Sequence, residues 1–477
     1  MITDELALII RETFGMHPTA EQELAIQTFC QFMTCRAPQP VMIMRGCAGT
    51  GKTSLASAFV RTMKQLQQKV ALMAPTGRAA KVFALNSGHE AYTIHRRIYR
   101  QKSSEGSMGS FSLDYNKEQD ALFVVDESSM IANDGQGQSI FGTGRLLDDL
   151  IQFVYSGRNC RLLLIGDKAQ LPPVGEEQSP ALQADVLKGY GLDVFECDLN
   201  EVLRQAQDSG ILYNATLIRQ QTTSGRLIQL PRIQFNLFAD ISNVPGNELI
   251  ETLENSYREV GKDETMVVTR SNKRANAYNI GIRNTILGRE EELTTGDMLL
   301  IVKNNYFWGN EEREKKKAFS FIANGDRAYV QRVRNIRELY GFRFADVWLT
   351  FPDYHDVELQ TTVVLDSLHT EAPALTREQD EQLFNAVMED YADIRSKSER
   401  LKKIKEDPYY NALQVKYAYA VTCHKAQGGQ WAHVYIDQGY MTEEMLTPDY
   451  IHWLYTAFTR ATERLFLVNW PEKQTET

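Results

Sequence analysis

A glycine-rich stretch near the start of the sequence carries the clearest chemical signal. Residues 46–53 read GCAGTGKT and fit the pattern G-x-x-x-x-G-K-[ST] without a mismatch. Apolar residues 41–44 precede it as an expected short buried strand, and Leu55, Phe59 and Met63 follow at helical spacing. A strand, a glycine loop and a helix in this order indicate a phosphate-binding loop.

The residue types in this loop suit a nucleoside triphosphate bound together with Mg²⁺. Gly46, Gly49 and Gly51 allow backbone N–H groups to turn toward phosphate oxygens, and the helix N-terminus adds favourable partial charge. We expect Lys52 to reach the β and γ phosphates and the Thr53 hydroxyl to ligate Mg²⁺.

A second acidic element follows an apolar strand predicted at residues 122–125. Asp126 and Glu127 come directly after it, in the stretch ALFVVDESSM. We expect Asp126 to hold Mg²⁺, directly or through water, and Glu127 to accept a proton from the attacking water. A small-molecule kinase shares the phosphate-binding loop but usually lacks a Glu beside this Asp.

Three further stretches add polar groups at the ends of predicted elements. Residues 71–81, ALMAPTGRAAK, predict a strand and then a helix whose N-terminal N–H groups could bind a second phosphate. Residues 162–174 predict a buried strand followed by Gln170, a neutral group suited to sensing a γ-phosphate. Arg204 lies in the stretch LNEVLRQ near the end of the first half.

The stretch VTCHKAQGGQ at residues 421–430 holds Cys423, His424 and Lys425 on what we expect to be a loop. A metal site, a nucleophile and a nucleic-acid contact are all open for such residue types. A metal site needs two more ligands, which the local sequence does not supply. Adjacent Cys and His side chains on an extended segment point apart, which disfavours a nucleophilic pair.

Composition limits the class of protein. The 477 residues predict several domains, with 43% hydrophobic and 24% charged residues, as in soluble proteins. A net charge of −10 argues against a protein that coats DNA, but not against one that grips nucleic acid in a local groove.

Cysteine usage and hydropathy indicate a cytoplasmic protein. The six cysteines are scattered without a CxxC pair, so neither a zinc site nor a disulfide framework is expected. No apolar run approaches the roughly 18 residues of a membrane helix. The N-terminal stretch MITDELALIIRETFG has acidic residues where a signal peptide is basic.

Taken in order, the motifs resemble those of superfamily 1 helicases, and most closely the RecD-like and Dda-like 5′-to-3′ group. They span residues 19–465 and read GCAGTGKT, APTGRAAK, TIHRRIY, VVDESSM, IGDKAQLPPV, EVLRQ, VVTRSNKRAN, ANGD, TCHKAQGGQ and YTAFTRATERL. The segment between Arg96 and Asp120 is short, where some relatives carry a longer wedge hairpin. The charged run from Glu371 to Asp407 matches no motif.

The resemblance implies roles around ATP. Gln22 would recognise adenine, and Arg204 and Arg460 would reach the γ-phosphate. Gln427 and Gly428, with Lys425, would lie on the nucleotide side of the cleft. The implied cofactors are ATP and Mg²⁺.

It also implies contacts to the backbone of single-stranded DNA. The candidate residues come from both motor halves: Thr76, His95, Asn304, Asn305, Thr422 and His424. Residues 421–430 would then couple the sensing of nucleotide to the binding of the DNA strand.

The implied fold is α/β, with two RecA-like motor domains and a small β-rich SH3-like insertion in the second. The first domain, 1A, is expected over residues 1–205, with a short insertion at 96–120 as candidate wedge 1B. The second, 2A, is expected over 206–310 and 411–477. Residues 311–410 are assigned to the insertion, 2B, which includes a helical part.

The implied function is ATP-dependent 5′-to-3′ movement on single-stranded DNA with duplex unwinding, by a monomer acting at single-strand to duplex junctions. Two alternatives stay open: the motor subunit of a helicase–nuclease complex, and a P-loop switch without a nucleic-acid track. The stretch FPDYHDVELQ resembles a nuclease carboxylate cluster only superficially, and no intrinsic nuclease is expected. Residue chemistry does not separate DNA from RNA.

Overall fold

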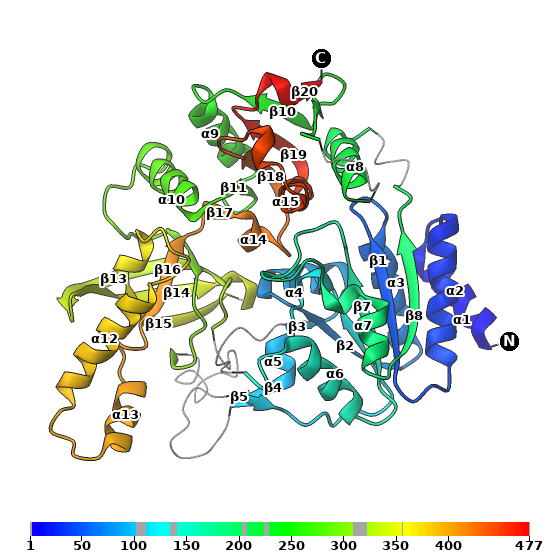
Figure 1. Cartoon of the computed structure of the whole chain (residues 1–477), viewed down its shortest axis with the longest axis horizontal. Coiled ribbons are helices and arrows are strands. Elements are labelled where there is room, and N and C mark those ends of the chain that lie inside the picture. Colours follow the sequence, from blue (N-terminus) through cyan, green and yellow to red (C-terminus); the bar gives the residue numbers. More distant parts are fainter. Residues whose placement is uncertain are drawn as a thin grey trace.

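The computed structural model describes residues 2–101, 111–133, 141–202, 208–223, 229–308, 322–354 and 356–476. Two parallel sheets and one closed barrel organise these residues, and Figure 1 shows α14 and α15 between the two sheets. The predicted α/β class, with two RecA-like domains and a small β-rich insertion, is confirmed. No helix in these ranges is both long enough and apolar enough to cross a bilayer.

The first sheet is built entirely from the N-terminal half of the chain. Its six strands are all parallel, in the order β3-β2-β6-β7-β1-β8. Their bounds are β1 Pro40–Gly46, β2 Lys69–Ala74, β3 Ala91–Thr93, β6 Ala121–Val125, β7 Arg161–Gly166 and β8 Asp193–Leu199. Strands β1 and β6 are buried along their whole length, as expected for central strands covered on both faces.

Helices cover both faces of this sheet through two separate apolar clusters. One cluster involves α1 Ile2–Phe14, α2 Ala20–Thr34, α3 Lys52–Gln65 and α4 Gly77–Ser87. The other involves α5 Ile94–Ile98, α6 Leu146–Ser156 and α7 Ala184–Gly189. The segment expected as wedge 1B contains the antiparallel pair β4 Tyr99–Gln101 and β5 Phe111–Leu113.

The second sheet draws its strands from distant parts of the sequence. Its five parallel strands lie in the order β10-β19-β18-β11-β17. The bounds are β10 Ile241–Val244, β11 Thr265–Thr269, β17 Ala420–Thr422, β18 Trp431–Asp437 and β19 Ala461–Val468. Its helices are α8 Gly210–Thr223, α9 Leu249–Glu259, α10 Asn272–Gly281, α14 Cys423–Ala426 and α15 Pro448–Phe458. A short pair, β9 Ile233–Gln234 and β20 Thr475–Glu476, lies outside it.

The barrel interrupts this second sheet between β11 and β17. Its strands are β12 Met298–Ile301, β13 Arg327–Leu339, β14 Phe342–Phe351, β15 Val357–Val364 and β16 Leu413–Tyr417. Strands β12 and β16 close the barrel and therefore belong to the insertion. The boundaries predicted from the sequence, at 310 and 411, assign both strands to domain 2A. The unmatched charged run contains two helices, α12 Arg377–Asp390 and α13 Lys397–Lys405, which pack on the barrel through their own apolar cluster.

A buried carboxylate joins the barrel to the second sheet. Asp297, just before β12, accepts two hydrogen bonds of 2.9 Å from the Arg283 guanidinium and one of 2.6 Å from Arg289 Nη1. The Tyr419 hydroxyl, just before β17, also donates to Asp297 at 3.0 Å. Both carboxylate oxygens are therefore satisfied, and the buried Asp297 charge is paired with two guanidinium groups, of which Arg283 is itself buried.

Replacing Asp297 by Ala should destabilise the protein by about 3–5 kcal/mol, because it leaves the buried Arg283 charge without its partner. The measurement is the midpoint of thermal or guanidinium unfolding. Asp185→Ala is the matched control, since the Asp185 side chain is fully exposed and its loss should leave the unfolding midpoint nearly unchanged. Equal shifts in the two variants would contradict a structural role for this ion-pair cluster.

Candidate functional site

The glycine loop lies between β1 and α3, as the sequence predicts. Gly49 and Gly51 have φ of +79° and +74°, the left-handed region that side chains disfavour. A β-carbon on Gly46 would come within 3.0 Å of Thr50 Oγ1 and 3.2 Å of Leu199 Cβ. The backbone here has a conformation that a phosphate cradle needs and that few other residue types allow.

Lys52 and Gln22 are both held against this loop. Lys52 Nζ donates to the Gly46 carbonyl at 3.0 Å, so the ammonium lies along the loop. The Gln22 amide donates to the Thr50 carbonyl at 2.9 Å, and its Oε1 accepts from Thr19 N–H in a capping box at the start of α2. Gln22 is buried and fixes the loop to α2, while a contact to adenine stays a prediction.

The acidic pair lies at the carboxyl end of β6, beside the glycine loop. Burial, reinforced by the neighbouring Glu127 charge and opposed by Lys52, raises the pKa of Asp126 to about 6. Glu127 has a φ of +53°, and its buried Oε2 has no hydrogen-bond partner. A carboxylate oxygen left unpaired inside a protein is costly unless a ligand or water pairs with it, which fits a catalytic base.

A magnesium ion fits the oxygen donors at this place. The Thr53 hydroxyl and the Asp126 carboxylate are the hard oxygen ligands that Mg²⁺ takes, usually completed by water and phosphate oxygens. Within the described ranges there is no group of three or more His, Cys, Asp or Glu side chains able to form a closed metal cage. This set is suited to a metal that arrives with a nucleotide.

The loop after β7 contributes Asp167 and Gln170. Burial raises the pKa of the Asp167 carboxyl, while Lys52 and a hydrogen bond from Tyr455 oppose the shift. Gln170 is buried, and its side-chain Oε1 has no hydrogen-bond partner. An unpaired amide oxygen on this loop is available to a water molecule or a ligand.

Helix α15 brings residues of the second half to this site. The buried Arg460, just after α15, donates to the carbonyls of Thr456 and Gly429. Its Nη1 lies 4.0 Å from Glu127 Oε1, across the boundary between the halves. Arg204, the other predicted arginine, lies outside the described residues.

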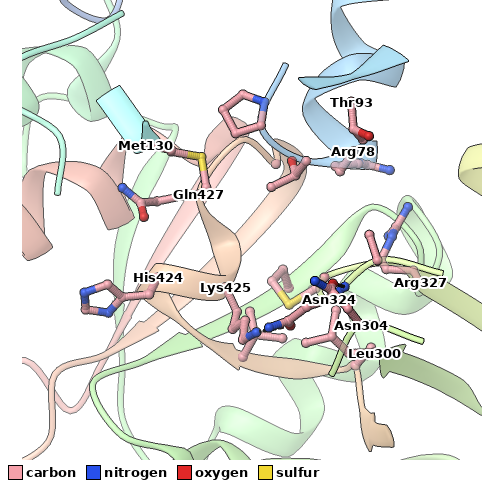
Figure 2. Close-up of a pocket in the computed structure, with 18 of the residues that line it drawn as sticks. Arg78, Thr93, Met130, Leu300, Asn304, Asn324, Arg327, His424, Lys425 and Gln427 are labelled. Atoms are coloured by element: carbon pink, nitrogen blue, oxygen red, sulfur yellow. Dashed lines mark hydrogen bonds between the residues drawn. The ribbon is translucent and has the colours of Figure 1, made fainter. Parts of the chain in front are cut away.

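A cavity of about 280 Å³, with polar and charged side chains among its lining residues, lies between the two motor halves and the barrel (Figure 2). Four of the predicted nucleic-acid residues line it: Thr76, His95, Asn304 and His424. Thr76 caps the N-terminus of α4, with its hydroxyl accepting from Ala79 N–H. Burial lowers the pKa of His95 to about 4, so this ring is neutral near pH 7.

The remaining predictions for the 421–430 stretch are only partly right. Instead of a loop, Cys423–Ala426 forms one helical turn, because β17 ends at Thr422 and delivers the chain into it. Cys423 is fully buried and its thiol contacts the Trp453 carbonyl at 3.5 Å. Burial raises the pKa of that thiol to about 12, which excludes a nucleophilic thiolate at neutral pH.

Lys425, Gln427 and Gly428 contact three different neighbours, and their place on the nucleotide side of the cleft stays a prediction. Lys425 Nζ donates to Asn324 Oδ1 in the cavity, and Figure 2 shows His424 extending away from that pair. Gln427 Nε2 donates to the Leu171 carbonyl at 2.7 Å, in the loop that follows β7. A β-carbon on Gly428 would come within 3.0 Å of the Thr76 hydroxyl and of Ala79 Cβ, so this glycine packs on α4.

Two predicted nucleic-acid residues lie elsewhere. The Asn305 amide is buried and closes a turn, accepting from the N–H groups of Phe307 and Trp308 and donating to the Asn411 carbonyl. These three bonds hold the side chain in the turn, and a contact to a strand stays a prediction. Thr422 lines a smaller neighbouring cavity together with Asn276 and Lys416.

Several residues that line the cavity of about 280 Å³ were not among the site residues predicted from the sequence. They include Arg78, Met130, Asn324, Arg327 and Trp431. Arg78 donates to the Gln430 carbonyl at 2.8 Å and lies over the Trp431 ring. Arg327 is buried, and its Nε and Nη1 have no hydrogen-bond partner. The stretch ANGDR carried the only local signal for Arg327, a cation just after a glycine turn.

Comparisons with known proteins agree with this arrangement. A family model described as an AAA domain matches residues 31–176, and one described as a UvrD-like helicase C-terminal domain matches residues 417–468. The ATP-dependent RecD2 DNA helicase of Deinococcus radiodurans is 31% identical over 28% of this chain and 16% of its own length.

Longer matches come from proteins without an assigned activity. An uncharacterised protein of Methanocaldococcus jannaschii is 26% identical over 90% of this chain, and the match spans 36% of that relative. One from Acanthamoeba polyphaga mimivirus is 21% identical over 93% of this chain and 98% of its own length.

Among solved structures, the Bacteroides Pif1 helicase in complex with ADP-AlF3 and single-stranded DNA is 13% identical, with a TM-score of 0.46 over 97% of this chain and 95% of that one. The Pif1 helicase of Candida albicans is 15% identical, with a TM-score of 0.39 over 97% of both chains.

The two family models fall on the two halves that meet at the site. The first contains the glycine loop, the acidic pair and Gln170, and the second contains residues 421–430 and Arg460. Together with the RecD2 similarity, they support the resemblance to superfamily 1 helicases that the motifs indicate.

Proposed function

We propose that this protein is an ATP-dependent DNA helicase that couples hydrolysis of Mg-ATP to movement along single-stranded DNA and to duplex unwinding. The observation that carries the proposal is the path of residues 421–430. His424 and Lys425 line the cavity between the halves, and Gln427 bonds to Leu171 in the loop that holds Asp167 and Gln170. One short segment thus connects the candidate nucleic-acid site with the candidate ATP site.

The nucleotide chemistry follows from the side chains around the glycine loop. Lys52 holds the β and γ phosphate oxygens, Thr53 and Asp126 hold Mg²⁺, and Glu127 accepts the proton of the attacking water. When bound, Mg²⁺ neutralises negative charge on the phosphate oxygens. Arg460, already beside Glu127, stabilises charge that develops on the transferred phosphoryl group. The unpaired amide oxygen of Gln170 accepts a hydrogen bond from the water that attacks the γ-phosphate, so Gln170 senses that group through the water.

The cavity suits the backbone of a single nucleic-acid strand. The buried Arg327 lies 3.7 Å from the buried side chain of Asp353 through Nη2, and its Nε and Nη1, which have no hydrogen-bond partner, are donors for a phosphate oxygen. Lys425, Asn304 and Asn324 add hydrogen-bond donors for phosphate oxygens, and Thr76 adds the N-terminus of α4. His424 contacts the strand from the second half. The choice of DNA over RNA rests on the RecD2 helicase similarity.

The domain assignment is also a proposal. We assign residues 1–205 to motor domain 1A and the second parallel sheet to 2A, with the barrel and α12–α13 as 2B. The alternatives are a motor subunit of a helicase–nuclease complex and a P-loop switch without a track. Stimulation of ATP hydrolysis by single-stranded DNA is expected of a helicase and of a motor subunit in a helicase–nuclease complex, and not of a P-loop switch without a nucleic-acid track.

Lys52→Ala should abolish ATP hydrolysis, because the phosphates lose their main side-chain cation. Glu127→Gln should keep nucleotide affinity while slowing hydrolysis by about 10²- to 10⁴-fold, because the base is lost and the shape remains. Steady-state phosphate release and binding of a fluorescent ATP analogue are the measurements. Glu177→Gln is the control, as that side chain is exposed on the loop after β7. Wild-type turnover in Glu127→Gln would rule out Glu127 as the base.

Affinity for single-stranded DNA should fall as pH rises from 7 to 9. Burial lowers the pKa of Lys425 to about 8, so its charge is present below pH 8 and lost above it. The expected loss, measured by fluorescence anisotropy, is up to about tenfold. Lys425→Arg should largely remove this pH dependence, because guanidinium stays protonated. The same pH dependence in both proteins would show that Lys425 does not bind the strand.

The proposed direction is 5′ to 3′, and it rests on the resemblance to the RecD-like group, since both polarity groups hydrolyse ATP in the same kind of cleft. Two duplexes should be compared, one with a 5′ single-stranded tail and one with a 3′ tail. ATP-dependent strand separation is expected only from the 5′ tail. Efficient unwinding from the 3′ tail alone would reverse the polarity and leave the ATPase proposal intact.

A further inference from the structure

One tyrosine hydroxyl of the second half lies inside the first half, between the glycine loop and Asp167. Tyr455, on α15, is buried to 1% exposure. Its hydroxyl accepts a 3.0 Å hydrogen bond from the Ala48 N–H of the glycine loop and donates a 2.6 Å hydrogen bond to Asp167 Oδ2. We call this pair of bonds the Tyr455 latch.

The donor in this latch belongs to the phosphate-binding machinery. Backbone N–H groups of a glycine loop are the donors that phosphate oxygens accept from, so Ala48 N–H is among the groups a nucleotide would engage. Asp167 lies on the other side of the hydroxyl, and its Oδ1 accepts separately from Ala169 N–H at 3.0 Å. The hydroxyl therefore contacts the cradle with its oxygen lone pair and the β7 loop with its proton.

Neighbouring contacts keep α15 on that loop independently of the cradle. Thr456 Oγ1 accepts from Leu171 N–H at 2.7 Å, and the His452 ring nitrogen Nδ1 donates to the Ala169 carbonyl at 2.8 Å. Neither bond involves the glycine loop. Among the described residues of α15, Tyr455 is the one whose side chain accepts a hydrogen bond from a backbone N–H of the glycine loop.

We propose that the Tyr455 hydroxyl competes with nucleotide for the Ala48 N–H, so that nucleotide binding breaks the cradle half of the latch and leaves the Asp167 half in place. This inference rests on the proposed ATP site. Tyr455 acts as a positioning residue. When nucleotide takes the Ala48 N–H, α15 loses its bond to the glycine loop, and this change reaches Arg460 and the second half through α15.

The sign of the effect on affinity follows from the two states. Removing the hydroxyl costs the nucleotide-free state both bonds of the latch. In the nucleotide-bound state the phosphate already satisfies Ala48 N–H, and only the bond to Asp167 is lost. The variant therefore loses more stability in the free state, and its affinity for nucleotide rises.

Tyr455→Phe should bind a fluorescent ATP analogue, in the presence of Mg²⁺, about 3- to 10-fold more tightly than the wild type. That range corresponds to one neutral hydrogen bond of ordinary strength. DNA stimulation of hydrolysis should fall in the same variant, since the cradle no longer acts on α15 through the hydroxyl. Unchanged or weaker nucleotide binding would overturn the latch.

Thr456→Val is the matched control. It removes a bond between the same helix and the β7 loop, but one that does not touch the cradle, so nucleotide affinity should stay within about twofold of the wild type. Equal tightening in both variants would mean that loosening the cleft, and not competition for Ala48, sets the affinity. A wild-type protein that binds no nucleotide would overturn the proposed function and the latch together.

A second variant covers the case in which Tyr455→Phe folds poorly because Asp167 loses its donor. Site-specific 3-fluorotyrosine at position 455 keeps the hydroxyl and nearly the same volume while making its oxygen a weaker acceptor. Its affinity for the analogue should shift in the same direction as in Tyr455→Phe and by less. Weaker binding than the wild type would contradict the competition.

Discussion

The packing of α15 against the loop after β7 is the contact on which the rest of the site depends. Each half alone holds an incomplete set: the first has the glycine loop, the acidic pair and Gln170, and the second has Arg460 and residues 421–430. Only where α15 meets residues 167–171 does Arg460 come within 4.0 Å of Glu127. Chemistry at this site is therefore sensitive to any change in the angle between the halves.

Burial at this contact governs the charge state of the groups that meet there. Asp126 and Asp167 both have raised pKa values because they lie away from water, and Lys52 opposes the shift in each. Two unpaired oxygens, Glu127 Oε2 and Gln170 Oε1, lie in the same region. A site with buried carboxylates and unpaired acceptors is poised for a ligand that brings cations and water, which Mg-ATP does.

Local motifs allowed the residues of the nucleotide site to be predicted from the sequence. Contacts that depend on tertiary packing could not be predicted in this way. The glycine loop, Asp126–Glu127 and the strands before them are encoded within a few residues, so their pattern survives in the sequence. Asn305 was predicted as a strand contact, and the turn that its amide closes depends on Asn411, far along the chain. Tyr455 sits in an apolar helix and reads as core, because nothing nearby indicates that its hydroxyl will reach Ala48.

The order of strands in the second sheet has a consequence for how the protein folds during synthesis. All six strands of the first sheet lie between residues 40 and 199, so that half can form once those residues have been made. In the second sheet, β19 lies between β10 and β18 but comes from residues 461–468. Until β19 is made, β10 has no strand partner in this sheet and β18 has one only in β11, so their free edges are open to wrong partners. The nucleotide-binding half is thus complete well before the half that completes its catalytic site.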